Sequence, residues 1–249
     1  MNAPAATTLV VAPAALAGEQ HRIEGSAYHH LVRVKRLEIG ERLRLVDGAG
    51  RARFAELASI GKRDALARLG DPAPANEPAL AVELFVAPPK PERAAWLVEK
   101  ATELGVVAIR FVATERTARD FGAAQLERLR RVAVAAVEQC GRARLPEISV
   151  EEGLEPILAR LVREPKRCIV LDASGESPFA GAPNSSRVPS ARFASPLPVA
   201  VLVGPEGGWS EAERELLAHP GIERWSLGGR TLRVETATVV AAGILLSGS

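Results

Sequence analysis

The chain of 249 residues contains only two cysteines and four histidines. Cys140 and Cys168 lie far apart in the sequence without Cys-x-x-Cys spacing, so neither a disulfide framework nor a structural zinc site is predicted. Apolar residues flank both cysteines, and we expect buried, inert thiols. The histidines also lack the spacing of metal ligands, so no metal site is predicted.

Long apolar runs are absent as well. None approaches the roughly 20 residues that a membrane helix needs. Segment 7–17 is apolar, but no positive residue precedes it and Pro13 interrupts it, which is unlike a signal peptide. With 47% hydrophobic and 25% charged residues, the composition is typical of a soluble globular protein, which we expect to be cytoplasmic.

The sequence lacks a P-loop and a Gly-x-Gly-x-x-Gly motif, yet it has a glycine turn in a suggestive place. The turn at residues 204–208 reads Gly-Pro-Glu-Gly-Gly and follows an apolar run, 197–203, that predicts a buried strand. Ser210 and Glu213 form a potential capping box for a helix that follows. Because glycine lacks a Cβ, such a turn lets the backbone approach a ligand closely, although a purely structural turn is an equal alternative.

A second glycine turn favours the functional alternative. Segment 222–227 predicts a strand that ends on Gly228 and Gly229, and an apolar helix is expected from about Thr236 to the C-terminus. Arg230, Arg233 and Glu235 fall in the short connection. Two glycine turns at successive strand ends could line one crevice, because parallel sheets bind ligands at the carboxyl ends of their strands.

The first 70 residues predict a small β barrel with one basic helix. Strands are expected at 8–11, 41–47, 51–60 and 65–69, with a hairpin turn at 47–50, and a short helix at 27–37. Residues 21–70 hold eleven Lys or Arg against six Asp or Glu, which suits a surface that meets phosphates, although a solvated basic face is the alternative. Segment 71–78 is proline-rich and is the best candidate for a linker.

Beyond residue 78, predicted strands and helices alternate, which indicates a parallel sheet with covering helices. Strands are expected at 80–87, 106–112, 147–150 and 167–172, and helices at 92–104, 123–140 and 154–164. Residues 172–175 form a third candidate ligand loop after a strand, and a Gly/Pro/Ser-rich loop is expected between 173 and 198.

The two glycine turns, GPEGGWS and LGGRTLRVETA, resemble the C-terminal signature of the SPOUT or α/β-knot methyltransferases, specifically the family that methylates N3 of a uridine in small-subunit (16S) ribosomal RNA. Segments 29–50, 99–106, 114–117 and 138–148 resemble the same family in the same order. Two positions depart from the family pattern: a basic residue is missing before the first strand, and Trp209 stands where Phe is more frequent.

The resemblance implies an α/β protein with a PUA-like, RNA-binding β barrel at 1–76 and a SPOUT methyltransferase domain at 77–249. It further implies a deep trefoil knot that binds S-adenosylmethionine, and a homodimer. The implied substrate is ribosomal RNA of the small subunit in the form of an assembled particle. The implied cofactor residues are Leu202, Gly204, Pro205, Glu206, Gly207, Leu227, Gly228, Leu232 and Thr236. The expected RNA-binding residues are Arg33, Arg36, Arg142 and Arg230.

Arg233 and Glu235 are the expected catalytic residues. Methylation of N3 removes an imide proton and places negative charge on the flanking carbonyl oxygens, where the Arg233 cation could stabilise it. Glu235 could accept the proton or hold the arginine in place. Glu138, Arg142 and Arg144 could line the substrate side or form an exposed, mixed-charge helix end. Two other classes stay open: a non-catalytic RNA-binding protein with the knot fold, and an α/β enzyme with another nucleotide-like cofactor.

Overall fold

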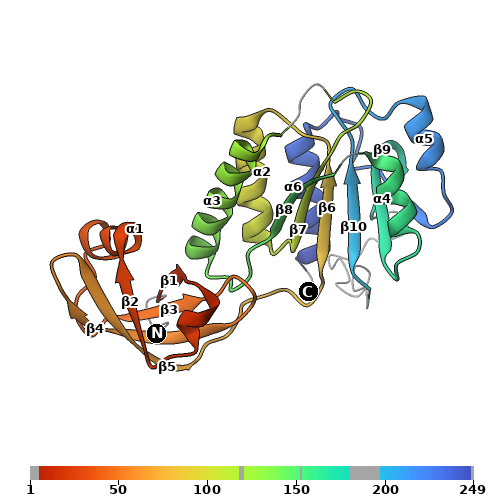
Figure 1. Cartoon of the computed structure of the whole chain (residues 1–249). Helices are drawn as coiled ribbons and strands as arrows, with labels where there is room; N and C mark the ends of the chain where they lie inside the picture. The colour runs from red at the N-terminus through yellow and green to blue at the C-terminus, as the bar shows by residue number, and fades with distance from the viewer. Residues whose placement is uncertain (1–5, 118–120, 152, 180–196, 248–249) are drawn as a thin grey trace. The chain divides into compact units, whose positions relative to one another are not determined.

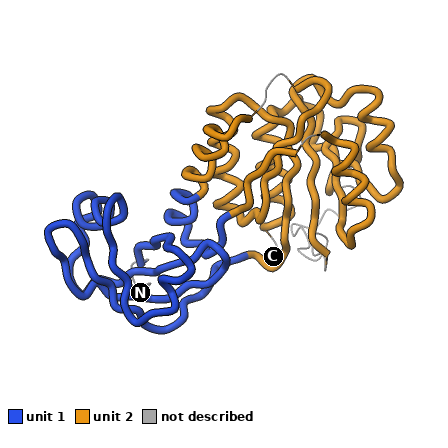
Figure 2. The backbone as a smooth tube through the Cα atoms, viewed as in Figure 1, with its two compact units in different colours: residues 1–77, 134–145 blue, residues 78–133, 146–249 orange. Residues whose placement is uncertain are grey.

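The computed structural model describes residues 6–117, 121–151, 153–179 and 197–247. The chain forms two compact units, each described here by itself (Figure 2). Unit 1 comprises residues 1–77 and 134–145, and unit 2 comprises residues 78–133 and 146–249. Most of the expected 173–198 loop lies outside the described residues.

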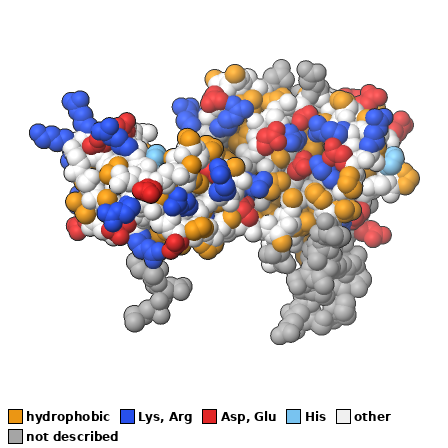
Figure 3. Space-filling model, turned by 60° about the horizontal axis from the view of Figure 1, so that its bottom comes forward, with side chains coloured by type: hydrophobic (Ala, Val, Ile, Leu, Met, Phe, Trp, Pro, Cys, Tyr) orange, Lys and Arg blue, Asp and Glu red, His pale blue; other side chains and the backbone are white. Residues whose placement is uncertain are grey.

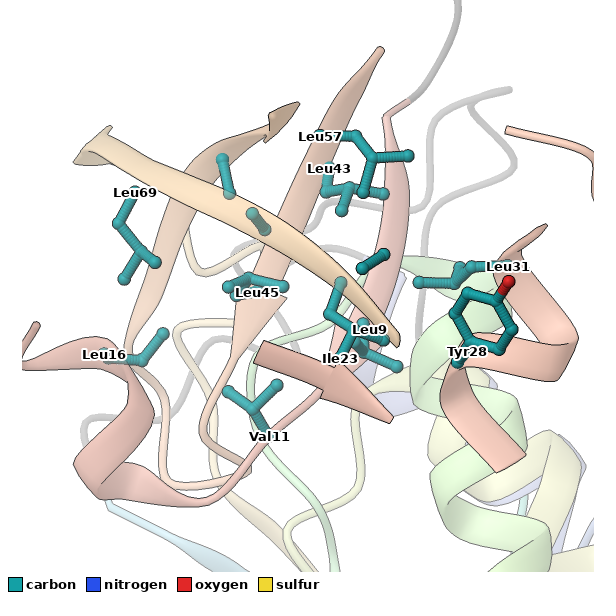
Figure 4. Close-up of a cluster of buried hydrophobic side chains, with 13 residues drawn as sticks. Leu9, Val11, Leu16, Ile23, Tyr28, Leu31, Leu43, Leu45, Leu57 and Leu69 are labelled. Atoms are coloured by element: carbon teal, nitrogen blue, oxygen red, sulfur yellow. The ribbon is translucent and has the colours of Figure 1, made fainter. Parts of the chain in front are cut away.

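Unit 1 contains a five-stranded sheet with the order β1-β3-β4-β5-β2. The strands are β1 (Thr7–Val10), β2 (Gln20–Glu24), β3 (Arg42–Val46), β4 (Ala52–Ile60) and β5 (Asp64–Pro72). Asp47 closes the predicted β3–β4 hairpin, because its carboxylate accepts hydrogen bonds from the backbone N–H groups of Ala49 and Arg51. Figure 4 shows the core of this unit, where Leu9, Ile23, Leu43, Leu45 and Leu57 converge from several strands.

The structure of unit 1 differs from the expectations in three places. Strand β2 was not predicted, because Gln20–Glu24 is polar except for buried Ile23. Strand β5 continues into the expected linker as far as Pro72. The expected helix 27–37 is a short α1 (Gly25–Tyr28) followed by a π-helical segment, η2 (His29–Val34), and a single 3₁₀ turn, η1 (Pro13–Leu16), precedes β2.

The C-terminal end of helix α3 (Ala123–Cys140) belongs to unit 1. Buried Arg44 donates hydrogen bonds from its guanidinium to the carbonyl oxygen of Gly141, at 2.7 Å, and to that of Arg142, at 3.3 Å. Glu138 accepts a hydrogen bond from the backbone N–H of Val10, at 3.0 Å. Val137 and Ala143 pack with β-sheet residues in a small hydrophobic cluster. The end of α3 is therefore an integral part of the unit 1 core.

Unit 2 is built on a six-stranded, fully parallel sheet with the order β11-β9-β10-β6-β7-β8, which confirms the predicted class. Its strands are β6 (Val82–Val86), β7 (Ala108–Val112), β8 (Glu147–Glu151), β9 (Arg167–Glu176), β10 (Val199–Val203) and β11 (Ile222–Trp225). Its helices besides α3 are α2 (Pro91–Leu104), α4 (Leu154–Leu161), α5 (Glu211–Leu216) and α6 (Val234–Leu246) (Figure 1). Strand β9 is longer than expected and includes the predicted loop 172–175.

Helices cover both faces of the parallel sheet. On one face, Phe85, Ala200 and Leu202 join a core cluster with α4 residues and Leu217. Because side chains alternate along a strand, Leu84 and Val201 point to the other face. Helix α6 packs there against β6, β10 and α2. The chain therefore returns from β11 at the sheet edge to α6 near its centre, and this return segment, residues 226–233, contributes to the site.

Among the described residues, no helix is long and apolar enough to cross a membrane.

Candidate functional site

A pocket of about 500 Å³ lies at the carboxyl ends of β9, β10 and β11. Three chain segments form its walls, and each follows or ends one of these strands. The lining residues are Leu171, Asp172, Ala173, Val203, Gly204, Pro205, Glu206, Gly208, Trp209, Arg214, Trp225, Ser226, Leu227, Gly228, Gly229, Arg230, Thr231, Leu232, Val234 and Ala237. Both glycine turns therefore line one crevice, as expected from the sequence.

The first glycine turn packs closely around Trp209. A Cβ on Gly204 would lie 2.8 Å from the Trp209 ring, so only glycine fits there without a shift. Trp209 is buried and donates a hydrogen bond from Nε1 to the carbonyl oxygen of Leu171, at 3.2 Å. The turn itself closes through Gly208, which has a φ of 69° and donates its N–H to the carbonyl oxygen of Pro205. Trp209 thus links the turn to the middle of β9.

The helix after the first turn begins with the predicted capping box. The Glu213 N–H donates to the Ser210 hydroxyl, and the Glu213 carboxylate accepts from the Ser210 N–H, at 2.8 Å. The other Glu213 oxygen accepts from the N–H of Glu115, at 3.0 Å. Next to it, Arg116 donates to the carbonyl oxygen of Gly207, at 2.6 Å. Segment 114–117 therefore supports the first turn from outside the pocket.

Arg93, which no sequence signal singled out, contacts two acidic residues of the site, Glu206 and Glu235. Its Nη1 donates to Oε1 of Glu206 in the first turn, at 2.5 Å. Its Nε lies 3.6 Å from Oε1 of Glu235, at the start of α6. Glu235 is buried, and its Oε2 has no hydrogen-bond partner among the described residues. Arg93 thus connects the first glycine turn to the last helix.

The second glycine turn has far fewer supports. Gly228 has a φ of 108°, which favours glycine, and neither Gly228 nor Gly229 has an atom within 4 Å of the place where a Cβ would stand. Within the described part of the chain, side chains 227–233 form no hydrogen bond or ion pair. Arg233 is exposed and is the N-cap residue of α6, where no side chain caps the helix. Open backbone at Gly228 and Gly229 thus lines this part of the pocket.

Arg233 and Glu235 do not pair with each other. The sequence allowed Glu235 to hold Arg233 in place, but the cation beside Glu235 is Arg93. Arg233 is exposed whereas Glu235 is buried, and neither residue is among those that line the pocket, although Val234 between them is. Their catalytic roles stay predictions.

Six of the nine predicted cofactor residues line the pocket, namely Gly204, Pro205, Glu206, Leu227, Gly228 and Leu232. The other three, Leu202, Gly207 and Thr236, are not among the lining residues. Leu202 is buried in the core cluster on the α4 face. Gly207 follows Glu206 directly and has the Arg116 side chain beside it.

Asp172 and Arg214 are two charged lining residues outside the predicted set, although Asp172 belongs to the third candidate segment. The Asp172 carboxylate accepts hydrogen bonds from the N–H and hydroxyl of Ser174, and its Oδ2 lies 3.8 Å from Nε of Arg214. Burial opposes ionisation, but these hydrogen bonds and the charges of Arg214 and Arg224 outweigh it and lower the pKa of Asp172. Asp172 therefore supplies a fixed negative charge to a pocket that also contains Arg230.

The predicted RNA-binding residues fall into three environments. Arg33 and Arg36 are exposed in unit 1, at the end of the π-helical segment, and Arg36 has a left-handed φ of 57°. Arg230 is exposed at the pocket. Arg142 corrects the expectation, because it is buried and bonded through Nη2 to Oε2 of Glu77, at 2.7 Å, and so cannot reach a phosphate. Glu138 is likewise used inside unit 1, and only Arg144 of that group is exposed.

Basic side chains project from the surface of unit 1 on the face that Figure 3 shows.

Cys168 is buried, and burial raises the pKa of its thiol, whereas Cys140 is only partly buried, contrary to expectation. Among the described residues, no group of three or more His, Cys, Asp or Glu could hold a metal ion.

The RNA methyltransferase domain family matches residues 76–246, a range that contains the pocket and all of its lining residues. The chain belongs to this RNA methyltransferase family. An RNA methyltransferase PUA domain also matches residues 23–70, in the sheet of unit 1. Both halves of the fold thus agree with the resemblance stated from the sequence.

Relatives of this RNA methyltransferase match it over most of its length. The ribosomal RNA small subunit methyltransferase E of Synechocystis sp. is 31% identical over 94% of this chain and 75% of the relative. The protein of the same name from Bacillus subtilis is 29% identical over 88% of this chain and 86% of its own. A Legionella pneumophila protein solved with bound S-adenosylmethionine is 26% identical, with a TM-score of 0.78 over 97% of each chain.

The pocket of this RNA methyltransferase is suited to S-adenosylmethionine. The absence of side chains at Gly228 and Gly229 leaves backbone groups open to a ligand with several hydrogen-bonding atoms. Asp172 offers a carboxylate to a ligand that carries positive charge. Leu171, Leu227 and Leu232 offer apolar contacts for a flat base.

Proposed function

We propose that the protein is an S-adenosylmethionine-dependent methyltransferase that modifies N3 of a uridine in small-subunit ribosomal RNA. The observation that carries the proposal is the pocket, because both glycine turns and the start of α6 meet there within the matched methyltransferase domain. Relatives that align with nearly the whole chain are named for methylation of the same RNA. This substrate implies a cytoplasmic protein.

When bound, S-adenosylmethionine supplies a methyl group carried on a positively charged sulfur. The remaining task falls to the protein, which must bind the uracil ring, remove its imide proton and stabilise the charge that appears on the carbonyl oxygens. Arg233 can stabilise this charge, because its guanidinium is exposed beside the pocket and has no partner among the described residues. Glu235, two residues after Arg233, is the carboxylate that could accept the imide proton.

RNA binding is assigned to the basic surface of unit 1, with Arg33 and Arg36 as contacts to phosphate. Both are exposed and belong to the matched PUA segment. Replacing both by alanine should lower the slope of log affinity against log salt by about 1.4–1.8, since each lost phosphate contact contributes about 0.7–0.9. The pair Lys62 and Arg63, also exposed in unit 1, is the matched control. Equal slopes for the two double variants would remove the assignment.

A homodimer also belongs to the proposal. Helices α2 and α6 pack side by side, and each keeps one large apolar residue exposed, Trp96 at 43% and Val240 at 40%. We place these two residues in the surface that the partner subunit covers. Sedimentation equilibrium of the wild type and of a Trp96→Glu, Val240→Glu double variant tests it, and a monomeric wild type would contradict it.

The decisive experiment is methyl transfer to small subunits from cells that lack the modification, with naked RNA in parallel. Calorimetry with S-adenosylmethionine, NAD and ATP separates the alternative cofactors. Cofactor binding without methyl transfer would favour a non-catalytic RNA-binding protein. Binding of NAD or ATP in place of S-adenosylmethionine would favour another enzyme class.

A further inference from the structure

Arg93 stands out because it contacts two acidic residues of the site, Glu206 and Glu235. It lies in the first turn of α2, which is not part of either glycine turn and does not line the pocket. Its side chain is 27% exposed, compared with 59% for Glu206 and 8% for Glu235. The guanidinium therefore spans from a solvated carboxylate in the first turn to a buried carboxylate at the start of α6.

The two oxygens of Glu235 differ in their surroundings. Oε1 lies 3.6 Å from Nε of Arg93, whereas Oε2 is inaccessible and has no hydrogen-bond partner among the described residues. Buried polar atoms are nearly always hydrogen-bonded, so an unpaired one needs an explanation, such as a bond that forms only with a ligand. Oε2 is an acceptor at the N-terminal turn of α6, next to lining residue Val234.

The substrate of the proposed reaction supplies the missing donor. Uracil in the reactive position presents one ring N–H, the imide N3–H, and an ionised carboxylate can only accept. We propose that Arg93 is a positioning residue that holds Glu235 through Oε1, so that Oε2 accepts the N3–H of the target uridine. The inference rests on the proposed function and adds the residue that orients the acceptor.

Arg93 also restrains the other side of the site. Through Glu206 it fixes the first glycine turn relative to α2, and through Glu235 it fixes the first turn of α6. A planar guanidinium can serve both carboxylates at once from different nitrogens, whereas an ammonium is a point charge that cannot reproduce this geometry. Lysine should therefore replace Arg93 only in part.

The test measures single-turnover methyl transfer, S-adenosylmethionine affinity and melting temperature for Arg93→Ala, Arg93→Lys, Glu235→Gln and the double variant Arg93→Ala, Glu235→Gln. Arg93→Ala should reduce the rate constant about 10- to 100-fold, because it misplaces a proton acceptor whose full contribution is about 100- to 10,000-fold. Cofactor affinity should change less than about threefold. Arg128→Ala, which alters an exposed arginine of α3, is the control and should match the wild type.

The double variant separates positioning from general structural support. If Arg93 acts through Glu235, the double variant should lose no more than Glu235→Gln alone, because residues that act as a unit are not additive. Glu206→Gln removes only the contact of Arg93 to the first glycine turn, and its effect is expected in cofactor affinity, because Glu206 lines the pocket. Should Arg93→Ala fail to fold, the pair Arg93→Lys and Arg93→Lys, Glu235→Gln gives the same comparison with a smaller expected loss.

Additive losses in the double variant, or equal rates for Arg93→Ala and wild type, would overturn the positioning role. A loss of rate that is fully matched by lost cofactor affinity would also overturn it. These outcomes differ from failure of the proposed function, in which the wild type itself would transfer no methyl group to the small subunit.

Discussion

The first glycine turn, residues 204–208, and the second, residues 228–233, line the same pocket but are held in different ways. The first is fixed by Trp209, by Arg93 through Glu206, and by Arg116 through the Gly207 carbonyl. The second has no side-chain hydrogen bond or ion pair in the described portion of the chain, and its glycines face open space. A rigid wall can position a ligand in advance, whereas a wall with free side chains can make its contacts when the ligand arrives.

The largest expected effect comes from Arg233 in the second turn. Arg233→Ala should cut single-turnover methyl transfer ~100-fold or more, on the order of 3 kcal/mol, if its guanidinium stabilises charge that appears only in the transition state. Melting temperature and cofactor affinity should stay near wild type, because the Arg233 side chain is exposed and makes no capping hydrogen bond to α6. Arg233→Lys should recover part of the rate. A joint loss of stability and cofactor binding would instead mean that the second turn is held as firmly as the first.

The first turn should respond in its stability. Gly204→Ala places a methyl group 2.8 Å from the Trp209 ring and should cost about 1–3 kcal/mol in the free energy of unfolding, with weaker cofactor binding. Gly207→Ala is the matched control, because its methyl group would meet only the flexible Arg116 side chain, at 3.5 Å. Urea unfolding and calorimetry on both variants test the difference. Similar costs for both variants would mean that the contact with Trp209 does not decide which residue fits at position 204.

The capping box makes a smaller contribution to the rigidity of the first turn. Ser210→Ala removes the acceptor for the Glu213 N–H and should cost about 1 kcal/mol in unfolding free energy. Ser247→Ala, at the C-terminal end of α6, is the control and is expected to be nearly neutral, because the hydrogen bond of the Ser247 hydroxyl is long, at 3.5 Å. Thermal unfolding of the two variants gives the comparison. Equal melting temperatures would show that Trp209 and Arg116 suffice to hold the turn.

The smallest effect concerns Asp172, which faces both turns. Since its pKa is lowered in the folded state, its ionised form stabilises the protein above its ordinary pKa of 3.8, and this contribution is lost as the pH falls through the lower folded value. The stability difference between wild type and Asp172→Asn should therefore stay constant above about pH 5 and shrink as the pH falls below it. Exposed Asp71→Asn is the control. A difference that does not depend on pH would mean that Asp172 acts through shape alone.

Much of this comparison could be predicted from local sequence. The capping box, both glycine turns and the alternation of strands and helices carry short-range patterns that survive folding. Arg93 could not be found in this way, because an arginine in the first turn of a helix is ordinary and its two partners are more than 100 residues away. The burial of Arg142 could not be predicted from local sequence either, because its partner Glu77 lies 65 residues earlier. Strand β2 was missed because a polar edge strand has only one buried residue to mark it.

The end of α3 has a consequence for how the protein is made. Unit 1 includes residues 134–145, so its sheet leaves the ribosome well before the segment that completes it. At about 5–20 residues per second, roughly 3–14 seconds separate the synthesis of Glu77 from that of Leu145. During this time Arg44 lacks its carbonyl partners at Gly141 and Arg142, and the cluster around Val46 is incomplete. The nascent chain must therefore carry an unfinished first unit until about a third of the second has been translated. A truncation after residue 77 would make that transient state permanent.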